Sequence, residues 1–385
     1  MSSIKDQFLL DPQVHYLNFG AFGACARPIF EEYQRLQFLL ERQPTAFITK
    51  TGPELLESSK MALSTYINAA PEDLIYITNP TFGVNIIANS LRLSPGDEVL
   101  STNLEYGACD RTWDYFCEQK GLHYIKQAIE LPILSKEHFL DSFWKGYSEK
   151  TKVIFLSHIT SMTALRLPVE EICAEARRRG LITVIDGAHV PGHIPLDIIA
   201  LDCDFYVGAC HKWMMTPKGS SFIYTAKNFQ SMMLPFVLSW GYKPVSSSGS
   251  TYIDYHTFIG TRDFTAFLTI PASIKFMEDF DWPKVAQNCR KDTQQFLLEA
   301  CEMLGSSPLA PVDDDFILQM GSIPVSCEKP GEVKEILLDQ FKLELPVFTQ
   351  NGNVYIRYSY NGYNSQEDLE ALREALSYLR AQKKI

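Results

Sequence analysis

The sequence has no uninterrupted apolar run of roughly 20 residues, the length that a membrane-spanning helix needs. Its first segment, MSSIKDQFLLDPQVHY, also lacks the basic stretch and continuous apolar core of a secretory signal. We expect no DNA-binding extension before residue 16. We therefore expect a cytoplasmic protein without a membrane partner.

Basic residues are fewer than acidic ones: 35 Lys and Arg stand against 46 Asp and Glu, which gives a formal net charge of -11. The acidic excess is spread along the chain and forms no terminal tail. Nucleic acids and anionic membranes repel such a protein, so we expect neither as its main partner.

The nine cysteines form no Cys-x-x-Cys pair, and several of them lie inside apolar runs. This pattern favours reduced, buried thiols over disulfides or a zinc site. His189 and His193 are four residues apart, but Pro191 and Gly192 between them rule out an ordinary helical pair of metal ligands. We expect no metal.

What the sequence does contain is a regular alternation of short apolar runs with amphipathic stretches. Hydrophobic residues make up 46% of the chain, which is long enough for two domains. The alternation predicts an α/β domain with a mainly parallel seven-stranded sheet flanked by helices. The expected strands are 74–78, 98–102, 122–126, 152–157, 181–186, 204–209 and 220–225.

The remaining segments suggest a second, smaller unit. Residues 228–265 are rich in loop-forming residues, helical patterning returns at 266–304, and the tail reads as α+β. We therefore predict an N-terminal segment (1–20) associated with the active site and the small domain, a large domain (21–265) and a small C-terminal α+β domain (266–385).

Polar residues follow four of the expected strands. In open α/β sheets, ligands bind beyond the carboxyl ends of the strands, so these clusters should meet at one edge. They are the turn at 79–83, the stretch 157–161, Asp186 with His189, and His211 with Lys212.

Lys212 is the most informative of these residues. It ends a run, FYVGACHK, that otherwise reads as a buried strand, where a charged amine would be costly. A Schiff base with an aldehyde cofactor would explain it, with Asp186 on a protonated pyridine nitrogen and the turn at 79–83 on a phosphate. Asp186 could equally be a local N-cap. A serine hydrolase is disfavoured, since no G-x-S-x-G elbow occurs.

The segments VIDGAHVPG and DFYVGACHKWMMTPKG resemble the pyridoxal 5'-phosphate (PLP) enzymes of aminotransferase class V, fold type I. The resemblance is closest to the branch with isopenicillin N epimerase and the ergothioneine-pathway C–S lyases. It is supported along nearly the whole chain by YLNFGAFG, LEYGA, SHITSMTA, LSWG, GTRD and IRYSYNGYN.

The resemblance implies a role for each matching position. Lys212 would be the Schiff-base lysine and proton shuttle, Asp186 would hold the pyridine nitrogen, and His189 would lie near the phenolic oxygen. Arg357 would bind the substrate carboxylate, with Asn18 lining the pocket. The further cofactor-binding positions would be Thr81, Phe82 and His211 at the phosphate, Tyr106 stacked on the ring, Ser161, and Thr261 reaching the phosphate of a neighbouring subunit.

The implied protein is a homodimer with composite sites that acts on an amino acid. The resemblance favours C–S lysis by β-elimination or epimerisation, with aminotransfer as the alternative. A cysteine desulfurase is disfavoured, because Cys327 is the nearest cysteine before Arg357 and lies thirty residues upstream of it. A PLP-binding module without turnover is the non-enzymatic alternative.

Overall fold

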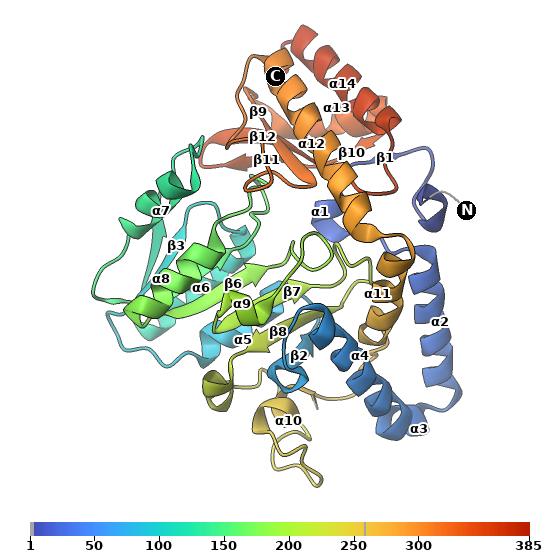
Figure 1. Cartoon of the computed structure of the whole chain (residues 1–385), viewed down its shortest axis with the longest axis vertical. Helices are drawn as coiled ribbons and strands as arrows, with labels where there is room; N and C mark the ends of the chain where they lie inside the picture. Colours follow the sequence, from blue (N-terminus) through green and yellow to red (C-terminus); the bar gives the residue numbers. More distant parts are fainter. Residues whose placement is uncertain (1–3, 258) are drawn as a thin grey trace.

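The seven expected strands form one sheet in the computed structural model, which describes residues 4–257 and 259–385 (Figure 1). Each strand begins and ends within one residue of the sequence-based expectation. Only β8 runs in the opposite direction to the other six strands, so the prediction of a mainly parallel sheet is confirmed. In order across the sheet the strands are β2 (Leu74–Ile77), β8 (Ser221–Thr225), β7 (Phe205–Ala209), β6 (Ile182–Gly187), β5 (Thr151–Ser157), β3 (Glu98–Thr102) and β4 (His123–Gln127).

Helices cover both faces of this sheet. Along β5, Val153 and Phe155 belong to one buried cluster, whereas Ile154 and Leu156 belong to another. This alternation follows from the two-residue period of a strand. The helices up to residue 257 are α1 (Phe19–Phe22), α2 (Arg27–Arg42), α3 (Pro44–Ala46), α4 (Gly52–Tyr66), α5 (Pro80–Ser90), α6 (Gly107–Lys120), α7 (Lys136–Trp144), α8 (Val169–Arg179), α9 (Ile198–Leu201) and α10 (Thr251–Thr257).

The C-terminal part forms a three-stranded antiparallel sheet with helices against it. The pattern expected at 266–304 becomes two helices because Asp281, between them, has a left-handed backbone with φ of 48°. The elements are α11 (Ile270–Asp279), α12 (Trp282–Leu304), β9 (Met320–Val325), α13 (Pro330–Phe341), β11 (Val347–Gln350), β12 (Asn353–Ser359) and α14 (Gln366–Ala381).

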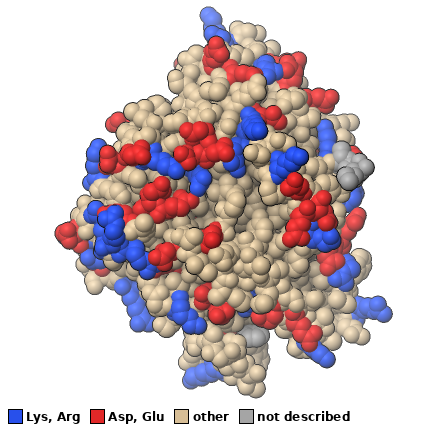
Figure 2. Space-filling view, viewed as in Figure 1, with Lys and Arg blue, Asp and Glu red and all other residues tan. Residues whose placement is uncertain are grey.

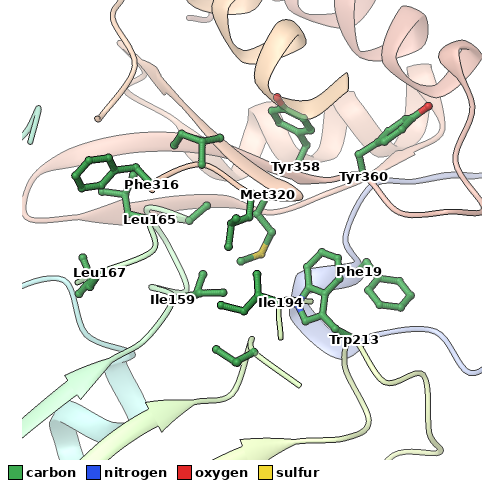
Figure 3. Close-up of a cluster of buried hydrophobic side chains, with 14 of the residues drawn as sticks. Phe19, Ile159, Leu165, Leu167, Ile194, Trp213, Phe316, Met320, Tyr358 and Tyr360 are labelled. Atoms are coloured by element: carbon green, nitrogen blue, oxygen red, sulfur yellow. The ribbon is translucent and has the colours of Figure 1, made fainter. Parts of the chain in front are cut away.

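The N-terminal segment pairs with this C-terminal part. Strand β1 (His15–Tyr16) runs parallel to β10 (Leu343–Glu344). Beyond the sheet, buried side chains from distant segments meet: Figure 3 shows Met320 near Ile194, with Phe19 beside Trp213. The domain boundaries at 20/21 and 265/266 stay a prediction.

The surface charges are mixed in sign, and the cysteines are unpaired. Acidic and basic side chains are interspersed on the face seen in Figure 2. All nine cysteines are free thiols, and seven are buried. In residues 4–257 and 259–385 no helix is both long and apolar enough to cross a bilayer, and no group of three or more potential ligands is arranged for a metal ion.

Candidate active site

The parallel strands place their carboxyl ends along one edge of the sheet, where a cavity of about 390 Å³ opens. A larger hollow of about 900 Å³ lies beside α11 and α12, and none of the described residues lining it is a predicted site residue. Seven of the predicted residues line the smaller cavity: Thr81, Tyr106, Ser161, Asp186, His189, His211 and Lys212.

Lys212 lies in the turn after β7, and its Nζ is 3.2 Å from Nε2 of His189. Desolvation lowers the pKa of Lys212 to about 8, although the charge of Asp186 opposes this. Burial also lowers the pKa of His189 well below its usual value, with the Lys212 charge adding to the effect. A substantial fraction of the amine is therefore uncharged near neutral pH, and only the uncharged amine is a nucleophile.

Asp186 is a buried carboxylate in β6. Its Oδ1 accepts the N–H of Ala188 at 2.9 Å, and its Oδ2 accepts the thiol of Cys109 at 3.4 Å. Burial raises its pKa, while the Ala188 bond and the Lys212 charge oppose the change. One oxygen thus makes the local turn contact, while each oxygen retains a lone pair for a ligand.

The N-terminus of α5, which follows β2, lines the cavity with Thr81. Asn79 caps this helix by accepting the N–H of Phe82 at 2.9 Å, so that amide already has a partner. The ring of Phe82 packs edge-on against Phe236 at 5.4 Å. The helix dipole and remaining free amides still suit an anion here.

His211 and Tyr106 also line the cavity. Nδ1 of His211 donates to the carbonyl of Ser220 at 3.0 Å, and burial lowers the pKa of His211 to about 4. Tyr106 precedes α6, and 43% of it is exposed. Its ring therefore remains free to cover a planar ligand.

Arg357, on β12, is buried without a carboxylate partner among the described residues. Its Nη1 donates to the carbonyl of Ser161 at 2.5 Å, and its Nη2 donates to Oδ1 of Asn18 at 3.3 Å. Its Nε is buried with no hydrogen-bond partner in the described structure. Burial lowers the pKa of Arg357 to about 10. An uncompensated buried guanidinium is costly, which indicates an anionic ligand.

Four predicted residues do not line this cavity: Asn18, Phe82, Thr261 and Arg357. Phe82 is next to the lining residue Thr81, and Arg357 contacts both Asn18 and the lining residue Ser161, whereas Thr261 lies apart. It is exposed in the segment after α10 and does not line the cavity of its own chain. Its expected contact with the cofactor of a neighbouring subunit stays a prediction.

Glu105 was not singled out in the sequence, although it lies beside Tyr106. It is buried; its Oε1 accepts the hydroxyl of Thr102 at 2.7 Å, and its Oε2 accepts the N–H and hydroxyl of Ser157 at 2.9 and 2.5 Å. Burial raises its pKa to about 8 against these hydrogen bonds. Its hydrogen bonds connect the end of β3 to the end of β5 at Ser157, which lines the cavity. The available signal was a carboxylate three residues after the end of an expected strand.

Three comparisons with known proteins bear on this site. The aminotransferase class-V family model matches residues 32–313. Isopenicillin N epimerase of Amycolatopsis lactamdurans is 30% identical over 98% of this chain and 98% of that protein. A probable chloroplastic L-cysteine desulfhydrase of Arabidopsis thaliana is 25% identical over 98% of this chain and 86% of that protein. A solved C-DES mutant with glycine covalently linked to its PLP cofactor shares the fold, with a TM-score of 0.84 at 19% identity, over 98% of this chain and 99% of that chain.

Proposed function

The chain belongs to the aminotransferase class-V family, whose cofactor is pyridoxal 5'-phosphate, and we propose on this basis that it acts on an α-amino acid by β-elimination of a sulfur group or by epimerisation. The main support for an amino-acid substrate is Arg357, whose buried guanidinium has no counter-charge among the described residues. A substrate carboxylate would provide its missing counter-charge.

The residues around the cavity fit PLP. Lys212 has an amine of lowered pKa and forms no ion pair within the described part of the chain. Asp186 offers a buried carboxylate, and the N-terminus of α5 offers a site for a phosphate beside Thr81. In this arrangement Lys212 would hold the aldehyde carbon, Asp186 would pair with the pyridine nitrogen, and Tyr106 would cover the ring.

When bound, PLP supplies an aldehyde that captures the substrate amine and a ring that withdraws electrons from the α-carbon. Arg357 binds the carboxylate and so orients the α-hydrogen. Lys212 would remove that proton, and its lowered pKa suits a base near neutral pH. Asp186 would hold a proton at the ring nitrogen. His189 would donate to the phenolic oxygen.

The two reactions differ only after proton removal. Similarity to the epimerase over nearly the whole chain favours return of the proton, whereas similarity to the desulfhydrase favours loss of a β-substituent. Aminotransfer is the alternative. A desulfurase would need a thiol nucleophile at the cavity, and no cysteine is found among the described residues lining it. Cys327 instead follows β9 and lines a separate hollow.

The experiment incubates purified holoenzyme with a panel of cysteine conjugates and amino acids in deuterated water. Keto-acid release would identify a lyase, while α-deuterium uptake with inversion and no keto acid would identify an epimerase. Lys212→Ala is the matched control, because it retains the cavity and lacks the base. Absence of both products across a broad panel would refute the proposal.

We also propose a homodimer with composite sites. Apolar side chains in the 234–245 segment are strongly exposed, including Leu238 (69%), Trp240 (77%) and Val245 (97%). The same segment contacts the active-site helix through Phe236, and Thr261 lies further along the chain. A second copy would cover these apolar side chains and bring its Thr261 to this cavity. Sedimentation of the holoenzyme as a monomer would contradict this.

A further inference from the structure

Trp213 directly follows Lys212 and is fully buried, with its Nε1 at 3.5 Å from Nδ1 of His189. An indole N–H can only donate, so the nitrogen that it faces must present a lone pair. A neutral imidazole with a lone pair on Nδ1 carries its proton on Nε2. That nitrogen is the one that faces Nζ of Lys212 and the cavity.

His189 is held in the neutral form in which this choice of tautomer matters. Burial lowers its pKa, and the cations Lys212 and Arg357 add to the effect. The imidazoles of His193 and His211 also face it; burial lowers their own pKa values to about 3 and about 4. The surroundings therefore disfavour a second proton but do not choose which nitrogen holds the first.

The indole cannot turn away from His189. Its ring stacks on His193 with centroids 3.8 Å apart and planes at 16°, and Phe19 packs against it at 5.1 Å (Figure 3). His193 is itself fixed, since its Nδ1 donates to the carbonyl of His189 at 2.9 Å and its Nε2 accepts the N–H of Gln319 at 3.1 Å. The N–H of Trp213 is thus fixed in direction.

We propose that Trp213 is a positioning residue that holds His189 as the Nε2–H tautomer, so that His189 donates a hydrogen bond to the phenolic oxygen of PLP. This inference rests on the proposed function, because it uses the expected place of the cofactor. Without the indole N–H, the Nδ1–H tautomer becomes accessible. Its bare Nε2 would then oppose the lone pairs of the phenolic oxygen.

The test is Trp213→Phe, which keeps an aromatic ring against His193 and removes the N–H. The bound cofactor is titrated by its visible absorbance against pH. Loss of the donor leaves the phenolic oxygen more basic, so the midpoint should move up by about one pH unit, the size expected for one hydrogen bond to a charged group. The dissociation constant of PLP, measured on the cofactor-free chain, should rise as well.

A double-mutant cycle separates the tautomer from general packing. In a His189→Gln background the donor is an amide that has no tautomers, so adding Trp213→Phe should leave the midpoint unchanged. Phe19→Leu is the control for packing, because the indole keeps its N–H and its stack on His193; the midpoint should stay near the wild-type value. Equal shifts in both backgrounds, or no shift in either, would overturn the inference.

A second measurement needs no variant. Nitrogen-15 spectra of histidine-labelled holoenzyme report which imidazole nitrogen of His189 is protonated, with assignment by comparison to His189→Gln. A protonated Nε2 supports the inference, and a protonated Nδ1 overturns it. Failure of the proposed function is distinct: the wild-type holoenzyme would then form neither keto acid nor inverted, deuterated substrate, whichever nitrogen of His189 is protonated.

Discussion

Nη2 of Arg357 lies 3.3 Å from Oδ1 of Asn18, across 339 residues of sequence. This contact joins β12 to the segment between β1 and α1, and the neighbouring backbone bond from Ser359 to Leu17, at 2.8 Å, holds the same two segments together. The part of the site around Arg357, where we propose that the substrate carboxylate binds, is therefore built from N-terminal and C-terminal segments of the chain. Its geometry depends on the N-terminal segment staying in place.

Asn18→Ala should weaken substrate binding more than turnover. The substitution removes one acceptor that orients Arg357, a hydrogen bond worth roughly 1 to 1.5 kcal/mol. We expect KM for the amino-acid substrate to rise by about tenfold, with a smaller change in kcat. Asn18→Asp should raise KM further, because its carboxylate would compete with the substrate for the guanidinium. An unchanged KM in both variants would contradict the role of this contact.

Lys212 should capture the cofactor in a pH-dependent manner. Desolvation lowers its pKa to about 8, so the free amine becomes abundant as the pH rises through this value. The rate at which the visible band appears after PLP is added to the cofactor-free chain should rise by about tenfold per pH unit below 8 and level off above it. Asp186→Asn removes the charge that raises this pKa, so the profile should shift to lower pH. A flat profile would contradict the assigned pKa.

The strands could be predicted because each is a short apolar run between turn-forming residues. The sheet in turn predicted the cavity, since parallel strands bring Asp186, His189 and Lys212 to one edge whatever the side-chain details. Strand β9 was missed because Gly321 and Pro324 interrupt its apolar pattern.

Contacts between distant side chains could not be predicted. Nothing in the residue types shows that Asn18 meets Arg357, or that the indole of Trp213 selects a nitrogen of His189. The same holds at the N-terminus of α5. The sequence predicted phosphate contacts for both Thr81 and Phe82, but the side chain of Asn79 already accepts the N–H of Phe82. Local pattern determines where the chain turns, while these contacts depend on packing across elements.

Mixed dimers should show whether the sites are composite. If Thr261 serves the neighbouring cofactor, Lys212→Ala and Thr261→Ala chains each have impaired sites alone. A hybrid of the two carries one site with both defects and one site with neither. We expect refolded mixtures to regain wild-type PLP affinity in about one quarter of all sites, the statistical share for random pairing of equal amounts. Strictly additive behaviour of the two parent proteins would contradict a composite site.

Glu105→Gln should change how stability depends on pH. Burial raises the pKa of Glu105 from 4.5 to about 8, against hydrogen bonds from Ser157 and Thr102. The folded chain therefore binds this proton more tightly than the unfolded chain. The contribution of this proton to the free energy of unfolding is complete below pH 4.5 and is lost as the pH rises through about 8. Glutamine is uncharged throughout, so the wild-type stability should fall relative to Glu105→Gln by about 5 kcal/mol across this window.

Urea unfolding of the two cofactor-free proteins at a series of pH values measures this difference directly, because all other titrating groups are shared. The competition at Glu105 is between desolvation, which favours the acid, and three donors from Thr102 and Ser157, which favour the carboxylate. A stability difference that did not change with pH would mean that the donors prevail. Glu105 would then be charged in the folded chain, and Glu105→Gln would be destabilising at every pH, because it would leave one of those donors unpaired.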